Sequence, residues 1–424
     1  MADVLLIQGG NPLYGQLKAS GAKNAALPIM AASLLASEPV ILNRIPNISD
    51  VRVLAQILQS LGCKVEFLAP ERLLIDSRQV NRTSAPYELG KMMNASFDII
   101  GALLSRFREA EVPLPGGCKL GNRSVDLHIE GFKALGAEVA VEHGFVKAKA
   151  KKLSGKYFGF SKCSVGATKT VMMAACLAQG KTVLENVAQE PEVSDLINFL
   201  NSLGASIKGA GTSRLVIQGQ KELGGGEYDI IGDRIETGTY LLAGAITEGE
   251  VEITGIDPQF LEIFLQQLQL ANQEVEIGEN SIKVKGRRPI APLQISTAPF
   301  PGFATDLHPP MAAFLTQAQG TSVIEENIFN SRFMYIQELN RLGSEISSRD
   351  RSLMIKGPSK LSCAPVEAPD IRAGGALVLA ALRAEGETEV SGVEYLDRGY
   401  QHIEEKLGAL GAKIRRQKKD AHRN

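Results

Sequence analysis

Cations recur in this 424-residue sequence at positions where helices are expected to begin. The unpaired N–H groups and the positive dipole end of a helix N-terminus attract anions, and an adjacent Lys or Arg strengthens that attraction. The pattern therefore predicts a site for a phosphate-bearing substrate. Capping or packing would explain any one of these positions, but it explains the whole set less well. The set comprises Lys23-Asn24, Lys162 with Ser164-Val165-Gly166, Arg234, Arg332, Arg372 and Arg398.

Cys118 is a second candidate for chemistry, because it lies in the Pro- and Gly-rich segment Pro113–Arg123 between cationic neighbours. Such neighbours lower the pKa of a thiol, and a loop of this composition suits a mobile lid. Cys163, next to a lysine, is compatible with a reactive or a structural role. The other three cysteines are interpreted as small buried apolar residues: Cys63, Cys176 and Cys363.

Other kinds of reactive site lack their sequence signatures. Gly180-Lys181-Thr182 resembles the end of a phosphate-binding P-loop, but Ala175 stands where that motif needs its first glycine. The sequence has no Cys-x-x-Cys pair and no His, Asp and Glu grouping with the spacing of metal ligands. The five histidines are dispersed, and His128 falls in an apolar helical stripe, so we interpret it as structural. No metal site is predicted.

Composition bounds the class of partner. Lys and Arg total 46 against 47 Asp and Glu, a formal charge of -1, so no net field attracts nucleic acid or an anionic membrane. Hydrophobic residues make up 44% of the chain, as in soluble globular proteins, and no apolar run is long enough to span a bilayer. Five scattered cysteines and an N-terminus without a basic signal region favour a cytoplasmic location. The sequence predicts no oligomeric state.

The elements that would position these residues recur six times along the chain. A Leu-Gly-small-x-β-branched cluster, or in one copy Ala271–Val275, begins at residues 61, 135, 203, 271, 342 and 410. Before each cluster, apolar residues at helical spacing predict a helix with one buried stripe, and the Gly or Asn predicts a left-handed cap. A short strand precedes each of these helices, and a second helix start lies upstream. The repeats predict an α/β protein of six βαβαββ modules, three in each of two domains.

Six segments, in order along nearly the whole chain, carry a family resemblance: Ser20–Pro28, Leu114–Cys118 with Arg123–His128, Ser164–Thr168, Asp233–Thr239, Asn330–Met334 and Asp397–Tyr400. They resemble the UDP-N-acetylglucosamine 1-carboxyvinyltransferases, within the EPSP synthase superfamily of enolpyruvyl transferases. The resemblance implies a two-domain inside-out α/β barrel. Its first domain would be 23–231, carrying the Cys118 loop, its second 1–22 with 232–424, and the active site would lie in the interdomain cleft.

The implied reaction transfers the enolpyruvyl group of phosphoenolpyruvate to the 3′-hydroxyl of UDP-N-acetylglucosamine, by addition and then elimination of phosphate. This would be the first committed step of peptidoglycan precursor synthesis. By similarity, Cys118 is the general acid and the thiol that fosfomycin alkylates, Asp306 accepts the sugar hydroxyl proton, and Lys23, Arg123 and Arg398 hold phosphoenolpyruvate. Residues implied to bind the UDP-sugar are Asn24, Asn94, Arg123, Ser124, Val125, Asp126, Leu127, Lys162, Ser164, Val165, Gly166, Asp306 and the backbone at Ile328, with Arg332 and Arg372 supporting closure. The resemblance implies no metal or organic cofactor.

One departure keeps alternatives open. The family usually has Arg where this chain has Asn94, and Asn can form hydrogen bonds but supplies no cation. Lys91 is a candidate to replace that charge. The alternatives are an enolpyruvyl transferase with another acceptor, such as a free nucleotide or shikimate 3-phosphate, and a non-catalytic UDP-sugar-binding paralogue. The cysteine-bearing loop disfavours the shikimate branch. A catalytic protein is favoured by four intact positions: Cys118, Asp306, Lys23 and Arg398.

Overall fold

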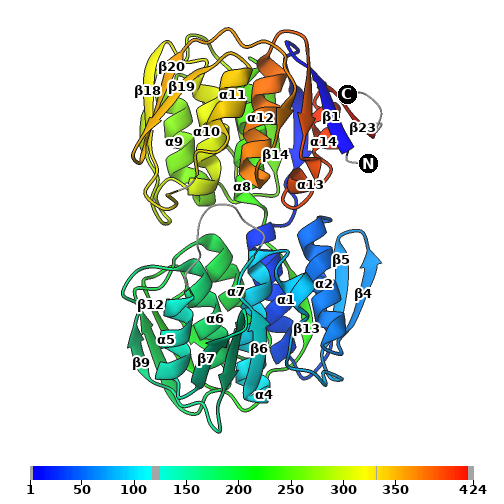
Figure 1. The fold of residues 1–424 in the computed structure, drawn as a ribbon, viewed down its shortest axis with the longest axis vertical. Helices are drawn as coiled ribbons and strands as arrows, with labels where there is room; N and C mark the ends of the chain where they lie inside the picture. The colour runs from blue at the N-terminus through cyan, green and yellow to red at the C-terminus, as the bar shows by residue number, and fades with distance from the viewer. Residues whose placement is uncertain (1–2, 117–124, 331, 419–424) are drawn as a thin grey trace. The chain divides into compact units, whose positions relative to one another are not determined.

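The computed structural model describes residues 3–116, 125–330 and 332–418, which form two compact units (Figure 1). Unit 1 is built from the described residues up to Ser20 and from Gly232 onward, and unit 2 from those between Gly21 and Ile231. Each unit has its own apolar core.

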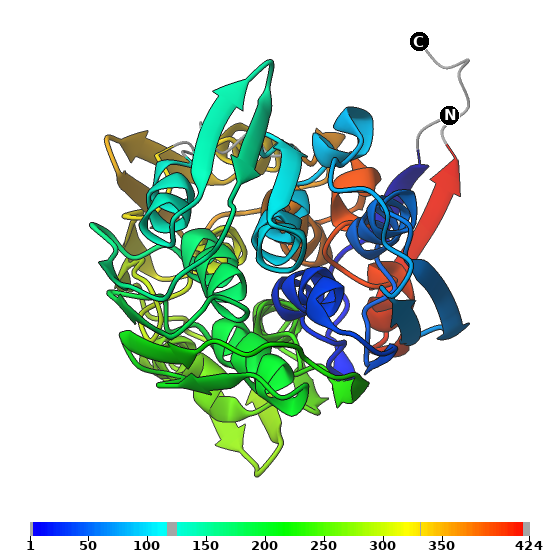
Figure 2. The same cartoon turned by 90° about the horizontal axis from the view of Figure 1, so that it is seen from below.

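Unit 2 is organised around three inner helices, α1 (Lys23–Ala32), α4 (Ile99–Phe107) and α6 (Val165–Ala175). They are apolar on nearly every side, which is typical of helices surrounded by other elements. Figure 2 shows them nearly end-on, in blue, cyan and green, with the strands of the unit toward its outside. The outer helices bury only one stripe each: α2 (Ser49–Ser60), α5 (Asp126–Ala134) and α7 (Pro191–Ser202).

Three small sheets complete unit 2, with strand orders β13-β3-β5-β4, β6-β8-β7 and β9-β10-β12-β11. The first sheet joins the two ends of the unit, because β13 from its last module pairs in parallel with β3 from its first. The strands are β3 (Val40–Asn43), β4 (Lys64–Ala69), β5 (Arg72–Asp76), β6 (Glu109–Pro113), β7 (Glu138–Glu142), β8 (Phe145–Lys149), β9 (Tyr157–Gly159), β10 (Lys181–Glu185), β11 (Ser206–Lys208), β12 (Arg214–Gln218) and β13 (Gly226–Asp229).

Unit 1 repeats this plan with inner helices α8 (Arg234–Ile246), α10 (His308–Leu315) and α12 (Ile371–Arg383). Its outer helices are α9 (Glu262–Leu270), α11 (Ile336–Arg341) and α14 (Ile403–Ala409). The short helical elements of the two units are η1 (Ser33–Leu35), α3 (Tyr87–Gly90), η2 (Asn94–Asp98), η3 (Pro258–Leu261), η4 (Thr305–Leu307) and α13 (Val393–Leu396).

The N-terminal strands complete two of the three sheets of unit 1. β1 (Asp3–Gln8) lies antiparallel between β22 and β23, and β2 (Tyr14–Lys18) pairs in parallel with β14. The first residues of the chain therefore belong to the same body as the last. The other strands are β14 (Glu250–Thr254), β15 (Glu274–Ile277), β16 (Ser281–Lys285), β17 (Gln294–Ser296), β18 (Gly320–Glu325), β19 (Glu345–Arg349), β20 (Ser352–Gly357), β21 (Val366–Glu367), β22 (Glu387–Ser391) and β23 (Lys413–Lys418).

The six-fold repeat expected from the sequence is confirmed by the backbone. The second residue after each outer helix has a positive φ of 96° to 102° where it is Gly, and 65° in the one copy where it is Asn272. Only glycine, and less readily asparagine, adopts this left-handed conformation at low cost, which is why the repeat retains them. The glycines are Gly62, Gly136, Gly204, Gly343 and Gly411.

Candidate active site

The inner helices of unit 1 each begin beside an aspartate. Asp233 and Asp370 are N-caps: their carboxylates accept hydrogen bonds from the first free N–H groups of α8 and α12. Asp306 lies in η4, directly before α10, and its side chain makes no cap. Its two carboxylate oxygens accept hydrogen bonds from guanidinium groups instead, so this side chain is not positioned as a helix cap.

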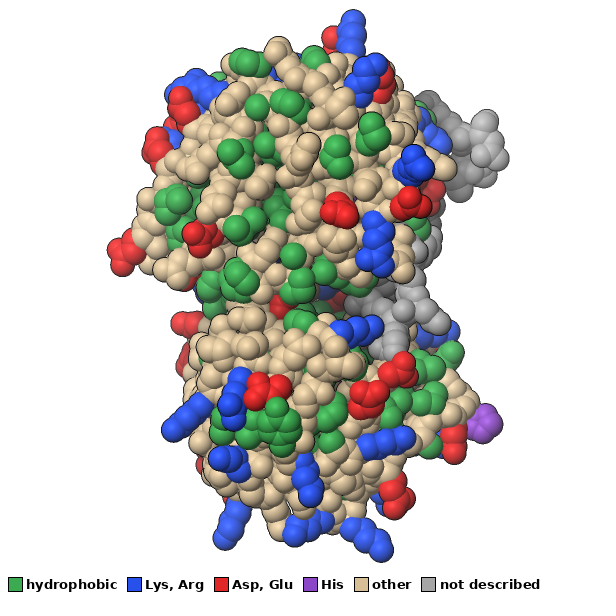
Figure 3. All heavy atoms as spheres, turned by 90° about the vertical axis from the view of Figure 1, so that its left-hand side faces the viewer, with side chains coloured by type: hydrophobic (Ala, Val, Ile, Leu, Met, Phe, Trp, Pro, Cys, Tyr) green, Lys and Arg blue, Asp and Glu red, His purple; other side chains and the backbone are tan. Residues whose placement is uncertain are grey.

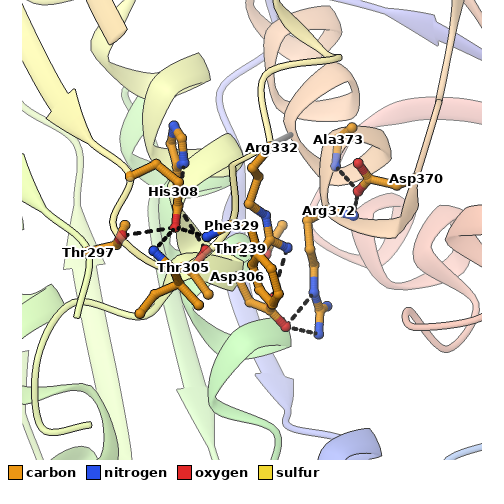
Figure 4. A network of polar contacts seen from close by, with 12 residues as sticks. Thr239, Thr297, Thr305, Asp306, His308, Phe329, Arg332, Asp370, Arg372 and Ala373 are labelled. Carbon is orange, nitrogen blue, oxygen red and sulfur yellow. Dashed lines mark hydrogen bonds and ion pairs between the residues drawn. The ribbon is translucent and has the colours of Figure 1, made fainter. Parts of the chain in front are cut away.

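Arg332 and Arg372 hold Asp306 between them (Figure 4). Arg332 Nη2 donates to Oδ1 at 2.8 Å, and Arg372 Nε and Nη2 each lie 3.1 Å from Oδ2. The guanidinium side chains are only 2% and 5% exposed, whereas that of Asp306 is 26% exposed. Burial alone would raise the pKa of Asp306, but the two guanidiniums outweigh it and hold the pKa well below its usual range.

Asp306 shares its single negative charge between two guanidiniums. Among the described residues, Arg332 Nε and Arg372 Nη1 are buried and have no hydrogen-bond partner. Buried donors without partners are costly, so they favour a nearby acceptor such as an anion. The arrangement around Asp306 therefore suits a site that combines a carboxylate with anion binding.

Two further predicted residues lie in unit 1. Ile328 follows β18, is 37% exposed, and its N–H donates to the Glu326 carboxylate at 2.8 Å. Glu326 also accepts from Thr305, whose hydroxyl in turn accepts from Arg332, so the loop at Ile328 connects to Asp306 through hydrogen bonds. Arg398 lies in the turn after α13 and is half-buried, so the expectation that it begins a helix is wrong. Glu326 was missed in the sequence, where it directly follows β18 and has no distinguishing neighbour.

In unit 2, Lys23 is the first residue of α1 and pairs with Asp50 of α2 at 2.8 Å. Both side chains are nearly buried, at 9% and 6% exposure. The predicted phosphate-binding ammonium is thus already held by a carboxylate, which fixes its position at the helix start. Asn24, the next residue of α1, is exposed.

The remaining described candidates of unit 2 lie on three neighbouring elements, η2, α5 and α6. The ring of Phe97 in η2 meets that of His128 in α5 edge-on at 5.1 Å, and a Cβ on Gly166 of α6 would come within 3.2 Å of the same imidazole. Ser164 caps α6 by accepting from the backbone N of Ala167 at 3.3 Å. The residues grouped here are Asn94, Val125, Asp126, Leu127, Ser164, Val165 and Gly166, with Lys162 exposed just before α6.

A buried ion pair joins the same elements. Lys169 Nζ of α6 lies 2.9 Å from Asp98 Oδ2 of η2, with side chains 11% and 6% exposed. Burial first, and then the Lys169 charge, lower the pKa of His128 to about 4, so this imidazole is neutral near pH 7. Its Nδ1 lies 2.8 Å from Thr170 Oγ1, in agreement with the structural role expected for it. Lys169 and Asp98 were missed, although each is a lone charge in an apolar helical stretch.

Two other expectations can be compared with the structure. Lys91 pairs with Glu88 at the surface, with Nζ and Oε2 2.6 Å apart and 46% of the lysine side chain exposed. Burial raises the pKa of Cys63 and of Cys176 to about 12, as suits buried apolar residues. The same interpretation of Cys363 is wrong: this thiol is exposed, because it lies in the connection that leads to β21 at a sheet edge.

The thiol of Cys163, left open by the sequence, is half-buried, and burial together with Glu190 raises its pKa. Three predicted residues, Cys118, Arg123 and Ser124, lie outside the described residues. The geometry therefore groups the predicted residues into an Asp306 cluster in unit 1 and a set of helix starts in unit 2.

No group of three or more His, Cys, Asp and Glu side chains could hold a metal ion within residues 3–116, 125–330 and 332–418. Over the same part of the chain, no helix is long and apolar enough to cross a membrane. On the face drawn in Figure 3, basic and acidic side chains are interspersed over both units. This face presents no extended field of one sign.

Six repeated α/β modules, three in each unit, define the class of this protein. A sequence model of the family "EPSP synthase (3-phosphoshikimate 1-carboxyvinyltransferase)" matches residues 7–407, so the chain belongs to the EPSP synthase family. Curated relatives are named UDP-N-acetylglucosamine 1-carboxyvinyltransferase. The relative from Gloeobacter violaceus is 48% identical, over 97% of this chain and 90% of its own length. The relative from Caldanaerobacter subterraneus is 47% identical, over 97% of this chain and 99% of its own length.

Solved structures agree with the fold. The enolpyruvyl transferase NikO from Streptomyces tendae matches with a TM-score of 0.88 at 26% identity, over 99% of this chain and all of that one. EPSP synthase from Acinetobacter baumannii matches with a TM-score of 0.73 at 17% identity, over 99% of this chain and all of that one. The predicted fold class, an EPSP synthase-like α/β architecture of six modules, is thus confirmed.

Proposed function

We propose that this protein transfers the enolpyruvyl group of phosphoenolpyruvate to the 3′-hydroxyl of UDP-N-acetylglucosamine and releases phosphate. The names of relatives that are 46–48% identical over nearly the full chain support this reaction. The observation that carries the proposal is the Asp306 carboxylate, partly exposed at a helix start between two buried guanidiniums. That arrangement supplies a proton acceptor beside an anion-binding site.

Asp306 is proposed to accept the proton of the sugar hydroxyl. Its low pKa makes it a weak base while both guanidiniums contact it. Substrate anions that draw Arg332 or Arg372 away would raise its basicity, since each lost cation removes stabilisation of the ionised form. Proton transfer would then become efficient only once the anionic substrates are bound.

Phosphoenolpyruvate is proposed to bind Lys23, Arg123 and Arg398, with Cys118 as general acid at its methylene carbon. Lys23 supports this role through its place at the start of α1, where the helix dipole and the ammonium both favour a phosphate. Asp50 would keep the Lys23 ammonium charged, and would fix its direction by accepting a hydrogen bond from one of the three N–H groups of that ammonium. Cations in these positions would replace the metal clamp that many phosphate-handling enzymes use.

The UDP-sugar is proposed to bind the exposed loop at Ile328 and the helix starts of α5 and α6. Exposed Ile328 offers an apolar surface, and Ser164–Gly166 open α6 with its N-terminal N–H groups. The proposed contacts are divided between unit 1 and unit 2, which we propose as the two domains of the enzyme.

Phosphate release from the purified protein tests this proposal. With phosphoenolpyruvate and UDP-N-acetylglucosamine together, phosphate should appear without added divalent metal, and neither substrate alone should support release. Activity abolished by EDTA and restored by a divalent ion would contradict the absence of a metal requirement.

A second candidate is enolpyruvyl transfer to a different acceptor, such as a free nucleotide. Asn94 favours it, because the resemblance implies an Arg at this position, and Asn does not supply the cation expected near the UDP-sugar. Replacing UDP-N-acetylglucosamine by uridine monophosphate in the same assay separates the two candidates. A higher kcat/KM for the nucleotide would support the second candidate against the first.

A further inference from the structure

Glu326 is a buried carboxylate that is linked to the Asp306 cluster through Thr305. Its Oε1 accepts from the backbone N of Ile328 at 2.8 Å, from that of Phe329 at 3.0 Å and from Thr297 Oγ1 at 3.0 Å. Its Oε2 accepts from Thr305 Oγ1 at 2.8 Å and contacts His308 Nδ1 at 2.9 Å. Five donors saturate the roughly four lone-pair sites of a carboxylate.

The protonation states in this network follow from burial. Burial alone would raise the pKa of Glu326, but the hydrogen bonds from His308, Phe329 and Thr305 hold it below its ordinary value. Burial lowers the pKa of His308 and raises that of Tyr335 well above 10, so both are neutral. Tyr335 then donates to His308 Nε2 at 2.9 Å, and Nδ1–H donates to an ionised Glu326.

The two oxygens of Glu326 serve different parts of the site. Oε1 fixes the loop that presents Ile328, which carries a proposed acceptor contact. Oε2 fixes the Thr305 hydroxyl with its proton toward Glu326, so that Oγ1 accepts from Arg332 Nη1 at 2.9 Å. Arg332 is thereby oriented so that its other terminal nitrogen, Nη2, donates a hydrogen bond to Asp306.

We propose that Glu326 is a positioning residue for the transfer reaction, which holds the proposed base through Thr305 and Arg332 and the acceptor loop through its backbone N–H groups. This inference rests on the proposed function. It predicts two separable arms: the connection through Thr305 affects kcat, and the connection through the loop at Ile328 affects binding of the acceptor. A residue needed only for folding would change kcat and the affinity for the acceptor together, or would change neither.

Two single substitutions separate the arms while leaving four donors on the carboxylate. Thr305→Val, which breaks the link to Arg332, should lower kcat at least tenfold and change the KM for UDP-N-acetylglucosamine less than twofold. Thr297→Val, which loosens the loop side, should raise that KM about fivefold or more and change kcat less than twofold. Glu326→Gln should show both defects. Thr321→Val, an exposed position on β18, is the matched control and should change neither.

Calorimetric binding of UDP-N-acetylglucosamine keeps this inference distinct from the proposed function, because binding does not need turnover. A wild-type protein that binds the nucleotide sugar but releases no phosphate contradicts the proposed reaction. A Thr297→Val variant with an unchanged Kd contradicts the positioning role. Kinetics in which kcat and 1/KM fall in proportion in both threonine variants also contradict it. A weakened Kd in Thr297→Val with an unchanged Kd in Thr305→Val supports it.

Discussion

Asp306→Asn is the substitution whose consequences the structure predicts most fully. The amide keeps the shape of the side chain but removes the charge that Arg332 and Arg372 share. Breaking a buried ion pair by removing one partner costs about 3 to 5 kcal/mol. Because Asp306 is 26% exposed, solvent screening places the expected loss of unfolding free energy near the lower end, about 3 kcal/mol.

The pH dependence of that loss follows from the direction of the pKa shift. The folded-state pKa of Asp306 lies below its ordinary value of 3.8, so the stabilisation is fully present above that value and is lost as pH falls through the folded pKa. Urea unfolding of the wild type and Asp306→Asn should therefore give the same difference at pH 7 and at pH 5. Below about pH 4 the difference should shrink.

The activity of the same variant tests the proposed base. Loss of a general base lowers kcat by roughly 10² to 10⁴. Asp257→Asn is the matched control, since it makes the same chemical change at a half-buried N-cap of unit 1, where Asn caps about as well as Asp. A stability difference that disappears between pH 7 and pH 5, or a kcat equal to that of the control, would refute the reasoning.

Three further predictions concern unit 2 and the cysteine loop. Cys118, outside the described residues, should be the thiol that fosfomycin alkylates; peptide mass spectrometry that finds the adduct elsewhere would contradict this. Asn94→Arg should lower the acceptor KM about tenfold through a charge-assisted contact. Lys91→Ala should leave that KM unchanged, because this lysine is paired at the surface. Steady-state kinetics with the opposite result would show that Lys91 compensates. Lys169→Met should raise the pKa of His128 above its value of about 4, measured by imidazole NMR, and an unmoved titration would mean that burial alone sets it.

The repeat could be predicted from sequence because its signals are local. Gly or Asn after each outer helix is required by backbone conformation, and the apolar stripe before it by helical geometry. The sheet with the strand order β21-β22-β1-β23 could not be derived from the repeat, since β1 lies at the opposite end of the chain from β22 and β23. Long-range strand pairing leaves no periodic signal in sequence.

The site was predicted in its charges but not in its pairings. Cations at helix starts pointed to Arg332 and Arg372, and the resemblance to Asp306, but nothing in the spacing indicated that one carboxylate lies between two guanidiniums. Glu326 and Asp50 escaped notice because a single carboxylate in a sequence carries no mark of its partners. Such partners become visible only when separate modules are packed together.

Enolpyruvyl transfer to the nucleotide sugar can be measured through both of its products in one reaction. Purified protein, treated with EDTA and supplied with phosphoenolpyruvate and UDP-N-acetylglucosamine, should yield phosphate and an enolpyruvyl ether of the nucleotide sugar in equal amounts, measured by colorimetry and mass spectrometry. Phosphate release that does not depend on UDP-N-acetylglucosamine, or the absence of the ether at saturating concentrations of both substrates, would show that the protein does not catalyse this transfer.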